Sequence, residues 1–276
     1  DLTNMSCSVN MGKRPRQEDN EEKAIDSDNR CNPSVDFVSL EKSLEFNDTL
    51  VALKIIVAQF PRIEKPSMQP FVLRSQLYSS VKDRTQADRE LETLTKEKVV
   101  RVFKLNTGQD DHAIMFVDDY LCQAEYAVQR KKQDGKEFLE AFDWFKKYVL
   151  NEKLDSGIHH DEICFLLSRG GKVKEEHISF LVNAGLLIRQ LIDSEKYWFT
   201  IPCIGPLLKG LSQGRKEVIS ILKRRRYKEM MLSQLEQTRL RQTPFDVRFH
   251  LRDLIGSSVL RSVNSPTGVF IRISND

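Results

Sequence analysis

The residues with the strongest chemical signal are cations gathered within residues 209–241. This segment contains ten basic residues and three acidic ones, Glu217, Glu229 and Glu236. Its local net charge is +7, whereas the whole chain carries +3, so the remaining residues sum to −4. Such an asymmetry predicts a polyanionic partner for this part of the chain.

Phosphate oxygens suit these side chains, because guanidinium groups donate forked hydrogen bonds and ammonium groups act as point charges. We therefore expect DNA or RNA as the partner, with binding to a duplex favoured. The alternatives are a solvated helix face, or a nuclear-localisation signal at residues 223–228. The candidate DNA-binding residues are Lys209, Arg215, Lys216, Lys223, Arg224, Arg225, Arg226, Lys228, Arg239 and Arg241.

A helix over about residues 215–236 is expected to carry most of these cations. Val218 and Leu222 fall on one face of that helix, whereas Met230 and Leu235 fall on roughly the opposite face. The helix therefore either breaks across residues 223–228 or packs against different neighbours on each side of them. Both possibilities leave the arginines of residues 224–226 in solvent. No array of Asn, Gln or Arg is placed to read bases, so contacts to the DNA backbone are expected.

The elements that must position this segment recur along the chain. Three helices followed by two short strands form the order of a winged helix, and this order occurs three times. The first copy predicts helices at residues 47–60, 71–78 and 85–97, with strands from residue 99 and at 113–117, followed by a connecting helix at 118–132. The second predicts helices at residues 138–149, 158–167 and 174–184, with strands at 186–192 and 197–201. The third begins near Pro206 and ends with a helix at 247–254 and strands at 259–263 and 269–273.

Apolar residues at matching positions support this repetition. Each copy has a triplet with gaps of three and then five residues, and each triplet precedes a two-stranded wing. The triplets are Leu91, Leu94, Val99; Ile178, Leu181, Leu186; and Leu251, Leu254, Val259. The expected fold is α+β and mainly helical, with three tandem winged-helix domains. The boundaries are residues 35–132, 133–203 and 204–276, with 204–276 carrying the basic helix.

Residues 1–34 are polar and nearly free of large apolar side chains, so a disordered tail is expected. Lys13, Arg14 and Arg16 form a short basic motif there that is typical of a nuclear-localisation signal, or else a solvated patch. No apolar stretch is long enough for a membrane span, and no secretory signal is recognisable. The five cysteines are scattered, which argues against a disulfide framework or a Cys-rich zinc site.

Enzyme chemistry finds little support. The loop, lysine and catalytic motifs of protein kinases are absent. Gly170-Gly171 is not followed by the Lys of a phosphate-binding loop, so it predicts a turn. The run at residues 159–162, two His followed by Asp and Glu, lacks the i,i+4 spacing of a zinc helix and predicts a helix start. No cofactor, metal or catalytic residue is therefore expected. The third helix of the first copy, residues 84–97, is nearly balanced in charge, and that of the second copy begins with Glu175 and Glu176. Both observations favour contacts with proteins over contacts with DNA for the first two copies.

Several segments of the C-terminal half resemble one family. They are Gly214-Arg215, the basic residues 223–228 with Tyr227, the stretch Phe249-His250-Leu251-Arg252-Asp253-Leu254-Ile255-Gly256 and the turn at residues 265–268. In these the chain resembles the serine/threonine-protein kinase 19 family. The resemblance is good from about Phe180 to the end and looser from Asn47 to that point.

The resemblance implies a nuclear, chromatin-associated protein with three winged helices that binds double-stranded DNA. It also implies a role in transcription-coupled nucleotide excision repair, with contacts to stalled RNA polymerase II and repair factors, as a monomer or homodimer. Kinase activity is claimed and disputed for the family, and the missing motifs argue against it. The family's DNA-contacting positions correspond to Lys209, Arg215, Lys223, Arg224, Arg226 and Arg239. Gly210 and Gln213 stand where animal members have bulkier or basic residues. A protein-interaction adaptor and an atypical kinase are the competing functions.

Overall fold

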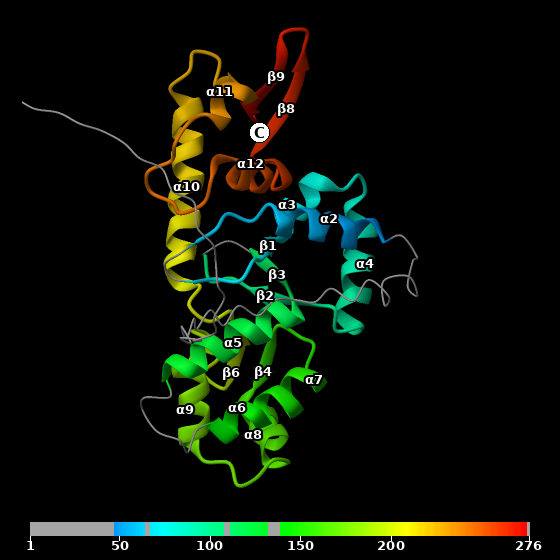
Figure 1. Ribbon diagram of the computed structural model, residues 1–276, viewed down its shortest axis with the longest axis vertical. Helices are drawn as coiled ribbons and strands as arrows, with labels where there is room; N and C mark the ends of the chain where they lie inside the picture. Colours follow the sequence, from blue (N-terminus) through cyan, green and yellow to red (C-terminus); the bar gives the residue numbers. More distant parts are fainter. Residues whose placement is uncertain (1–46, 64–66, 108–110, 132–138, 275–276) are drawn as a thin grey trace, which may run out of the picture. The chain divides into compact units, whose positions relative to one another are not determined.

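A computed structural model of the chain describes residues 47–63, 67–107, 111–131 and 139–274 (Figure 1). The chain divides into two units, Asp1–Asp36 and Phe37–Asp276, and all described residues belong to the second. The expected tail, with Lys13, Arg14 and Arg16, lies outside the described residues.

The first set of elements forms around a three-stranded antiparallel sheet with the order β1-β3-β2. The side chain of Asn47 accepts a hydrogen bond from Leu50 N at 3.1 Å and so caps the first helix, as predicted. Asp83 caps the third helix in the same way. In chain order the elements are α2 (Asp48–Ala58), β1 (Val72–Leu73), α3 (Arg74–Ser80), α4 (Arg84–Lys96), β2 (Val100–Lys104) and β3 (His112–Phe116).

Helix α5 (Val117–Lys131) follows, and a second set of elements surrounds a sheet with the order β4-β6-β5. Gly185 ends the last helix of this set with a φ of +77°, the left-handed conformation expected at that position. The elements are α6 (Leu139–Trp144), a π-helical turn (Phe145–Val149), α7 (Leu150–Glu152), β4 (Gly157–His159), α8 (His160–Ser168), α9 (Glu175–Asn183), β5 (Leu187–Arg189) and β6 (Lys196–Phe199).

The third set repeats the arrangement, with a sheet of order β7-β9-β8. The helical members of the three predicted triplets are all buried, whereas Val259 is exposed. The elements are α10 (Gly205–Lys223), β7 (Glu229–Met231), α11 (Leu232–Glu236), α12 (Val247–Gly256), β8 (Leu260–Ser265) and β9 (Gly268–Ile273).

The first strand of each sheet is missing from the sequence-based assignment. β1, β4 and β7 are two or three residues long, which is too short to show an alternating pattern. As a result, the helices predicted from residues 71 and 158 begin at Arg74 and His160 instead. The basic helix predicted over residues 215–236 breaks after Lys223, which selects the first of the two possibilities left open.

Gly170 and Gly171 form a turn between α8 and α9, as predicted. Their role is packing, because the indole of Trp144 lies directly on them. A Cβ added to Gly170 would be 2.3 Å from the indole ring, and one on Gly171 would be 2.7 Å from it. The glycine pair is therefore required by a neighbouring ring and not by a phosphate.

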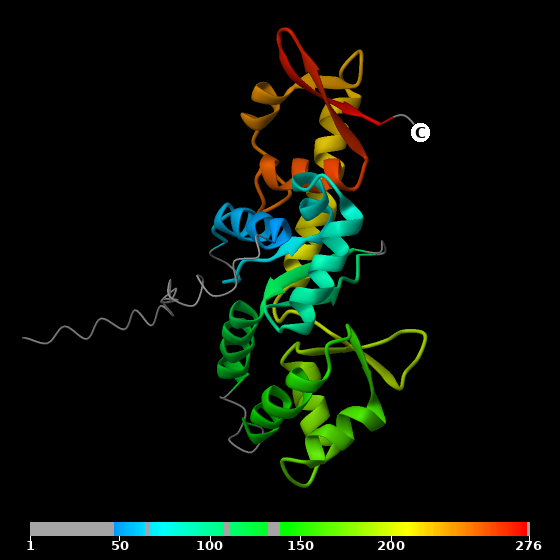
Figure 2. The ribbon, with the colours of Figure 1, turned by 90° about the vertical axis from the view of Figure 1, so that its right-hand side faces the viewer.

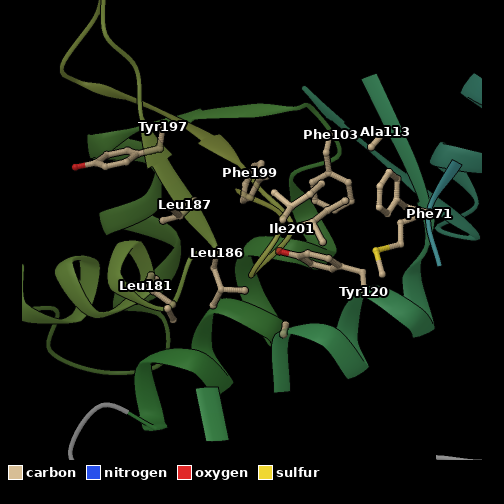
Figure 3. Packing of buried hydrophobic residues seen from close by; sticks show 14 of the residues in the cluster. Phe71, Phe103, Ala113, Tyr120, Leu181, Leu186, Leu187, Tyr197, Phe199 and Ile201 are labelled. Carbon is tan, nitrogen blue, oxygen red and sulfur yellow. The ribbon is translucent and has the colours of Figure 1, made fainter. Parts of the chain in front are cut away.

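All three sets contribute to one hydrophobic core, which Leu211 of α10 and Phe249 of α12 join from the third set. The rings of Phe103 on β2 and Tyr120 on α5 are tilted by 43° with their centroids 4.8 Å apart, and they belong to one cluster with Phe199 and Ile201 (Figure 3). The third set also has a separate core, built around Val218 and Leu222 of α10. Its helix α12 packs on α3 of the first set (Figures 1 and 2). Within the described ranges, no helix is both long and apolar enough to span a bilayer.

His250 makes the fold of the third set sensitive to acid. Its ring on α12 is fully buried, with Nε2 3.0 Å from Thr243 Oγ1. Burial, together with the nearby charge of Arg215, lowers the pKa of His250 from 6.5 to about 4. The unfolded chain therefore takes up this proton at higher pH than the folded chain. His250 stabilises the fold fully above pH 6.5, and this contribution disappears as the pH falls towards 4.

We expect acidification from pH 7 to 4 to remove about 3 kcal/mol of stability through this one group. Urea unfolding of the wild type and of His250→Gln, each at pH 7 and at pH 4, measures the difference. The variant should lose less stability than the wild type over this interval. An identical loss in both proteins would show that His250 titrates normally.

Candidate nucleic-acid interface

Helix α10 separates a buried face from a cationic one. Lys209, Lys216 and Lys223 are exposed and recur every seven residues, so they lie in one stripe along the helix. At 1.5 Å per residue, the stripe extends about 21 Å. The opposite face is apolar and holds the helix in place through the buried residues Leu207, Leu211, Val218 and Leu222.

The end of α10 continues this positive surface into a turn. Residues 223–228 are all exposed, and the chain turns there into β7, with Lys228 at a φ of +52°. The guanidinium of Arg226 lies 5.2 Å from the ring centroid of Tyr227. Within the described residues, no cation of this turn forms an ion pair with a carboxylate. We call Lys209, Lys216 and residues 223–228 together the basic surface.

Arg215 does not belong to the basic surface, which corrects the expectation that it contacts DNA. Its Nη1 donates to Asp111 Oδ2 at 2.7 Å, and its Nε donates to Asp253 Oδ2 at 2.6 Å. Only 13% of its side chain is exposed, and the Asp253 side chain is fully buried. Burial alone would lower the pKa of Arg215, but the hydrogen bonds to both carboxylates raise it. Arg215 is thus a structural link between α10, α12 and the loop before β3.

Arg239 and Arg241 are exposed in the loop after α11. This loop is fastened to α10, because the backbone N–H groups of Arg241 and Gln242 donate to the carboxylate of Glu217 at 3.1–3.2 Å. Glu217 follows Lys216 in α10. The loop that contains Arg239 and Arg241 is therefore attached to the helix that carries Lys209, Lys216 and Lys223.

Helix α12 is unavailable to a DNA groove. It is the third helix of the last set, the element that a winged helix normally places in a major groove. Helix α3 covers it, with Gln76 Nε2 donating to the Phe249 carbonyl at 3.0 Å. A Cβ on Gly256 would stand only 1.6 Å from the carbonyl oxygen of Ser75. Any DNA contact of this set must therefore be made by other elements.

A groove adjoins the N-terminal half of α10. It has a volume of about 960 Å³ and is lined by Lys209 and Lys216 together with Lys104 and Arg189, with no carboxylate among the described residues of its lining. Its outer wall is the hairpin joining β5 to β6, where Leu191 and Ile192 are 96% and 101% exposed. The groove therefore combines positive charge with an apolar edge.

The sequence interpretation missed one cluster of side chains that could bind a metal or act in catalysis. His160 and Cys164 lie four residues apart on α8, with Nε2 and Sγ separated by 3.6 Å, and Glu175 Oε1 is 3.4 Å from the same nitrogen. The i,i+4 spacing was the signal that could have found the pair. Burial, with Glu175 and Asp161 nearby, raises the pKa of Cys164, so its thiol is not an activated nucleophile. In the part of the chain that the structure describes, no three such side chains have the arrangement of a metal site.

Comparison with known proteins identifies relatives over most of the chain. The family model described as inactive serine-threonine protein kinase 19 matches residues 41–273. A human protein named winged helix repair factor 1 is 31% identical over 227 residues, covering 80% of this chain and 84% of its own. The proteins of the same name from Xenopus laevis and Dictyostelium discoideum are 28% and 23% identical, over 81% and 98% of this chain and 82% and 72% of their own.

Proposed function

Because the chain belongs to the inactive serine-threonine protein kinase 19 family, we propose that it is a non-catalytic, double-stranded DNA-binding scaffold in DNA repair. The basic surface carries this proposal: an exposed stripe and turn of cations without carboxylate partners in the described residues. Relatives named winged helix repair factor 1 support the repair role.

We further propose three tandem winged-helix domains at residues 35–132, 133–203 and 204–276. Three sheets of equivalent order, each accompanied by three or more helical elements, support this division. The basic motif Lys13, Arg14 and Arg16 would direct the protein to the nucleus. Transcription-coupled nucleotide excision repair, beside stalled RNA polymerase II and its repair factors, is the pathway that the family resemblance suggests.

The proposed contacts are to the DNA backbone and not to bases. Phosphates along one strand of B-DNA follow each other at about 3.4 Å of helix axis, so a stripe of about 21 Å can follow roughly six of them. Lys209, Lys216, Lys223 and the turn after them would make these contacts, with Arg239 and Arg241 beside them. Since α12 is covered, base preference is not expected.

A second candidate function is a protein-interaction adaptor without DNA binding. The groove favours it, because the exposed Leu191 and Ile192 at its edge offer nothing to a phosphate but suit an apolar side chain of a protein partner. The two functions are distinguished by whether duplex DNA binds at physiological salt.

Duplex binding should weaken steeply with salt if the basic surface neutralises phosphates. For about six contacts, a plot of log Kobs against log salt concentration should have a slope on the order of −5. Fluorescence anisotropy with a labelled duplex of about 20 base pairs, between 50 and 200 mM KCl, measures it. Single-stranded and bubble-containing DNA measured in parallel show whether duplex structure matters. A slope near zero, or no binding at physiological salt, would favour the adaptor.

A further inference from the structure

The hairpin between β5 and β6 exposes two adjacent aliphatic side chains, Leu191 and Ile192, almost completely to solvent. Backbone hydrogen bonds define the shape of this hairpin on either side of its tip. Gln190 N donates to the Lys196 carbonyl oxygen at 2.9 Å, and Lys196 N donates to the Asp193 carbonyl oxygen at 3.1 Å. The hairpin therefore holds the two side chains in water, where they bury almost none of their apolar surface. Contiguous exposed apolar side chains rimmed by polar groups are typical of a surface that binds another protein.

Further apolar side chains line the groove between this hairpin and α10. Ile188 on β5 is exposed, and Trp198 on β6 is half-buried with the Lys104 ammonium 5.2 Å from its ring centroid. Leu208 belongs to α10 and is also half-buried. Since these side chains come from both sides of the groove, a peptide lying in it can pack apolar side chains against the hairpin and against the helix.

The charge of the groove selects an acidic partner. Arg189, Lys209 and Lys216 are exposed in its lining, and none of the described lining residues is a carboxylate. Within the part of the chain that the structure describes, Lys209 and Lys216 form no ion pair. A chain of phosphates would satisfy these cations but would leave Leu191 and Ile192 in water. An acidic segment that also carries large apolar side chains complements both the charge and the apolar edge.

We propose that the groove binds an acidic segment of a partner protein. Large apolar side chains of the segment pack against Leu191, Ile192 and Trp198, and its carboxylates pair with Lys209 and Lys216. This docking rests on the adaptor given above as the second candidate function, gives its partner a chemistry and does not require DNA binding. Because Lys209 and Lys216 also belong to the basic surface, a bound segment and duplex DNA compete for these two cations. The turn after α10 remains available to DNA.

The probe is a fluorescein-labelled peptide of about ten residues in which Asp and Glu flank Leu and Phe. One control peptide has every acidic residue replaced by its amide, and the other has every apolar residue replaced by Ser. Oligo(dT) represents single-stranded nucleic acid. Fluorescence anisotropy with the full chain at physiological salt, without duplex DNA, should show the probe bound at least tenfold more tightly than the other three. Equal affinity for any of the three, or no binding of the probe, would overturn the proposal.

Replacing the apolar edge tests the packing half of the proposal. Leu191→Ser with Ile192→Ser should weaken probe binding at least tenfold, because two large side chains lose their contact with the peptide. Both side chains lie in solvent, so their loss leaves no cavity in the fold. Val51→Ser with Ile55→Ser is the matched control, since these aliphatic side chains are exposed on α2 outside the groove. With both variants shown to be folded by circular dichroism, equal probe affinity in the two would contradict docking at the hairpin.

Reversing the charge tests the other half. Lys209→Glu with Lys216→Glu should weaken probe binding at least tenfold, whereas Lys223→Glu, in the same stripe but outside the groove, should leave it unchanged. Saturating probe should also make the salt slope of duplex binding less steep by about 2, because two phosphate contacts are displaced. An unchanged probe affinity in the double variant, or an unchanged slope, would place the peptide elsewhere. Absence of duplex binding would defeat the DNA-binding proposal and leave the anisotropy test of the groove intact.

Discussion

Replacing Lys223, Arg224 and Arg226 together by Glu is expected to abolish retention of duplex DNA in a gel-shift assay. The three side chains are exposed at the end of α10 and without carboxylate partners in the described residues, so the fold does not depend on their charge. The substitution removes three phosphate contacts and adds three negative charges that repel the DNA backbone. An affinity loss on the order of 100-fold or more at physiological salt follows.

The control must separate a local contact from a change in net charge. Lys54, Lys82 and Lys172 are exposed at sites outside the basic surface, and their replacement by Glu changes the net charge equally. This variant should retain the duplex nearly as well as the wild type. Circular dichroism and urea unfolding should show both triple variants folded with unchanged midpoints. Equal loss of binding in the two would mean that net charge and not the basic surface holds DNA.

The sequence predicted which segment carries the charge, but not how each cation is used. Lys209, Lys216 and Lys223 repeat every seven residues, and this spacing is visible in the sequence once a helix is assumed. Arg215 looks equivalent in the sequence, because its carboxylate partners, Asp111 and Asp253, lie 104 and 38 residues away along the chain. No local pattern reveals such a pairing. The cations that stay exposed are therefore identified only by the tertiary fold.

The order of helices and wing strands was predictable because each set repeats an apolar triplet whose two helical members are buried. What the sequence could not show is that the last set turns its third helix against the first set. That contact depends on small and polar groups, with Ser75 Oγ donating to Asp253 at 2.6 Å and Gln76 bonded to the Phe249 carbonyl. Asp253 and Gly256 belong to one of the stretches in which the sequence resembles the family. In this chain Asp253 and Gly256 pack α12 against α3, and this role accounts for them without a contact to DNA.

Gly256 is the closest point of that packing, and its replacement by Ala should be strongly destabilising. An added Cβ would stand 1.6 Å from the Ser75 carbonyl oxygen and 3.1 Å from Ser79 N. Both are backbone atoms of α3, so the clash cannot be relieved by rotation of a side chain. Helices α12 and α3 must separate, which breaks the hydrogen bonds of Asp253 and Gln76 across the interface. The gain in helix propensity from Gly to Ala, about 1 kcal/mol, is small by comparison.

We expect Gly256→Ala to lower the free energy of unfolding by about 3 kcal/mol or more, as overpacking against a fixed backbone does. Urea unfolding monitored by tryptophan fluorescence and circular dichroism measures the change. Gly205→Ala is the matched control, because Gly205 begins α10 with no atom within 4 Å of an added Cβ. This variant should stay within about 1 kcal/mol of the wild type. If Gly256→Ala were as stable as Gly205→Ala, α12 would not be packed on α3 and its surface would be free to enter a DNA groove.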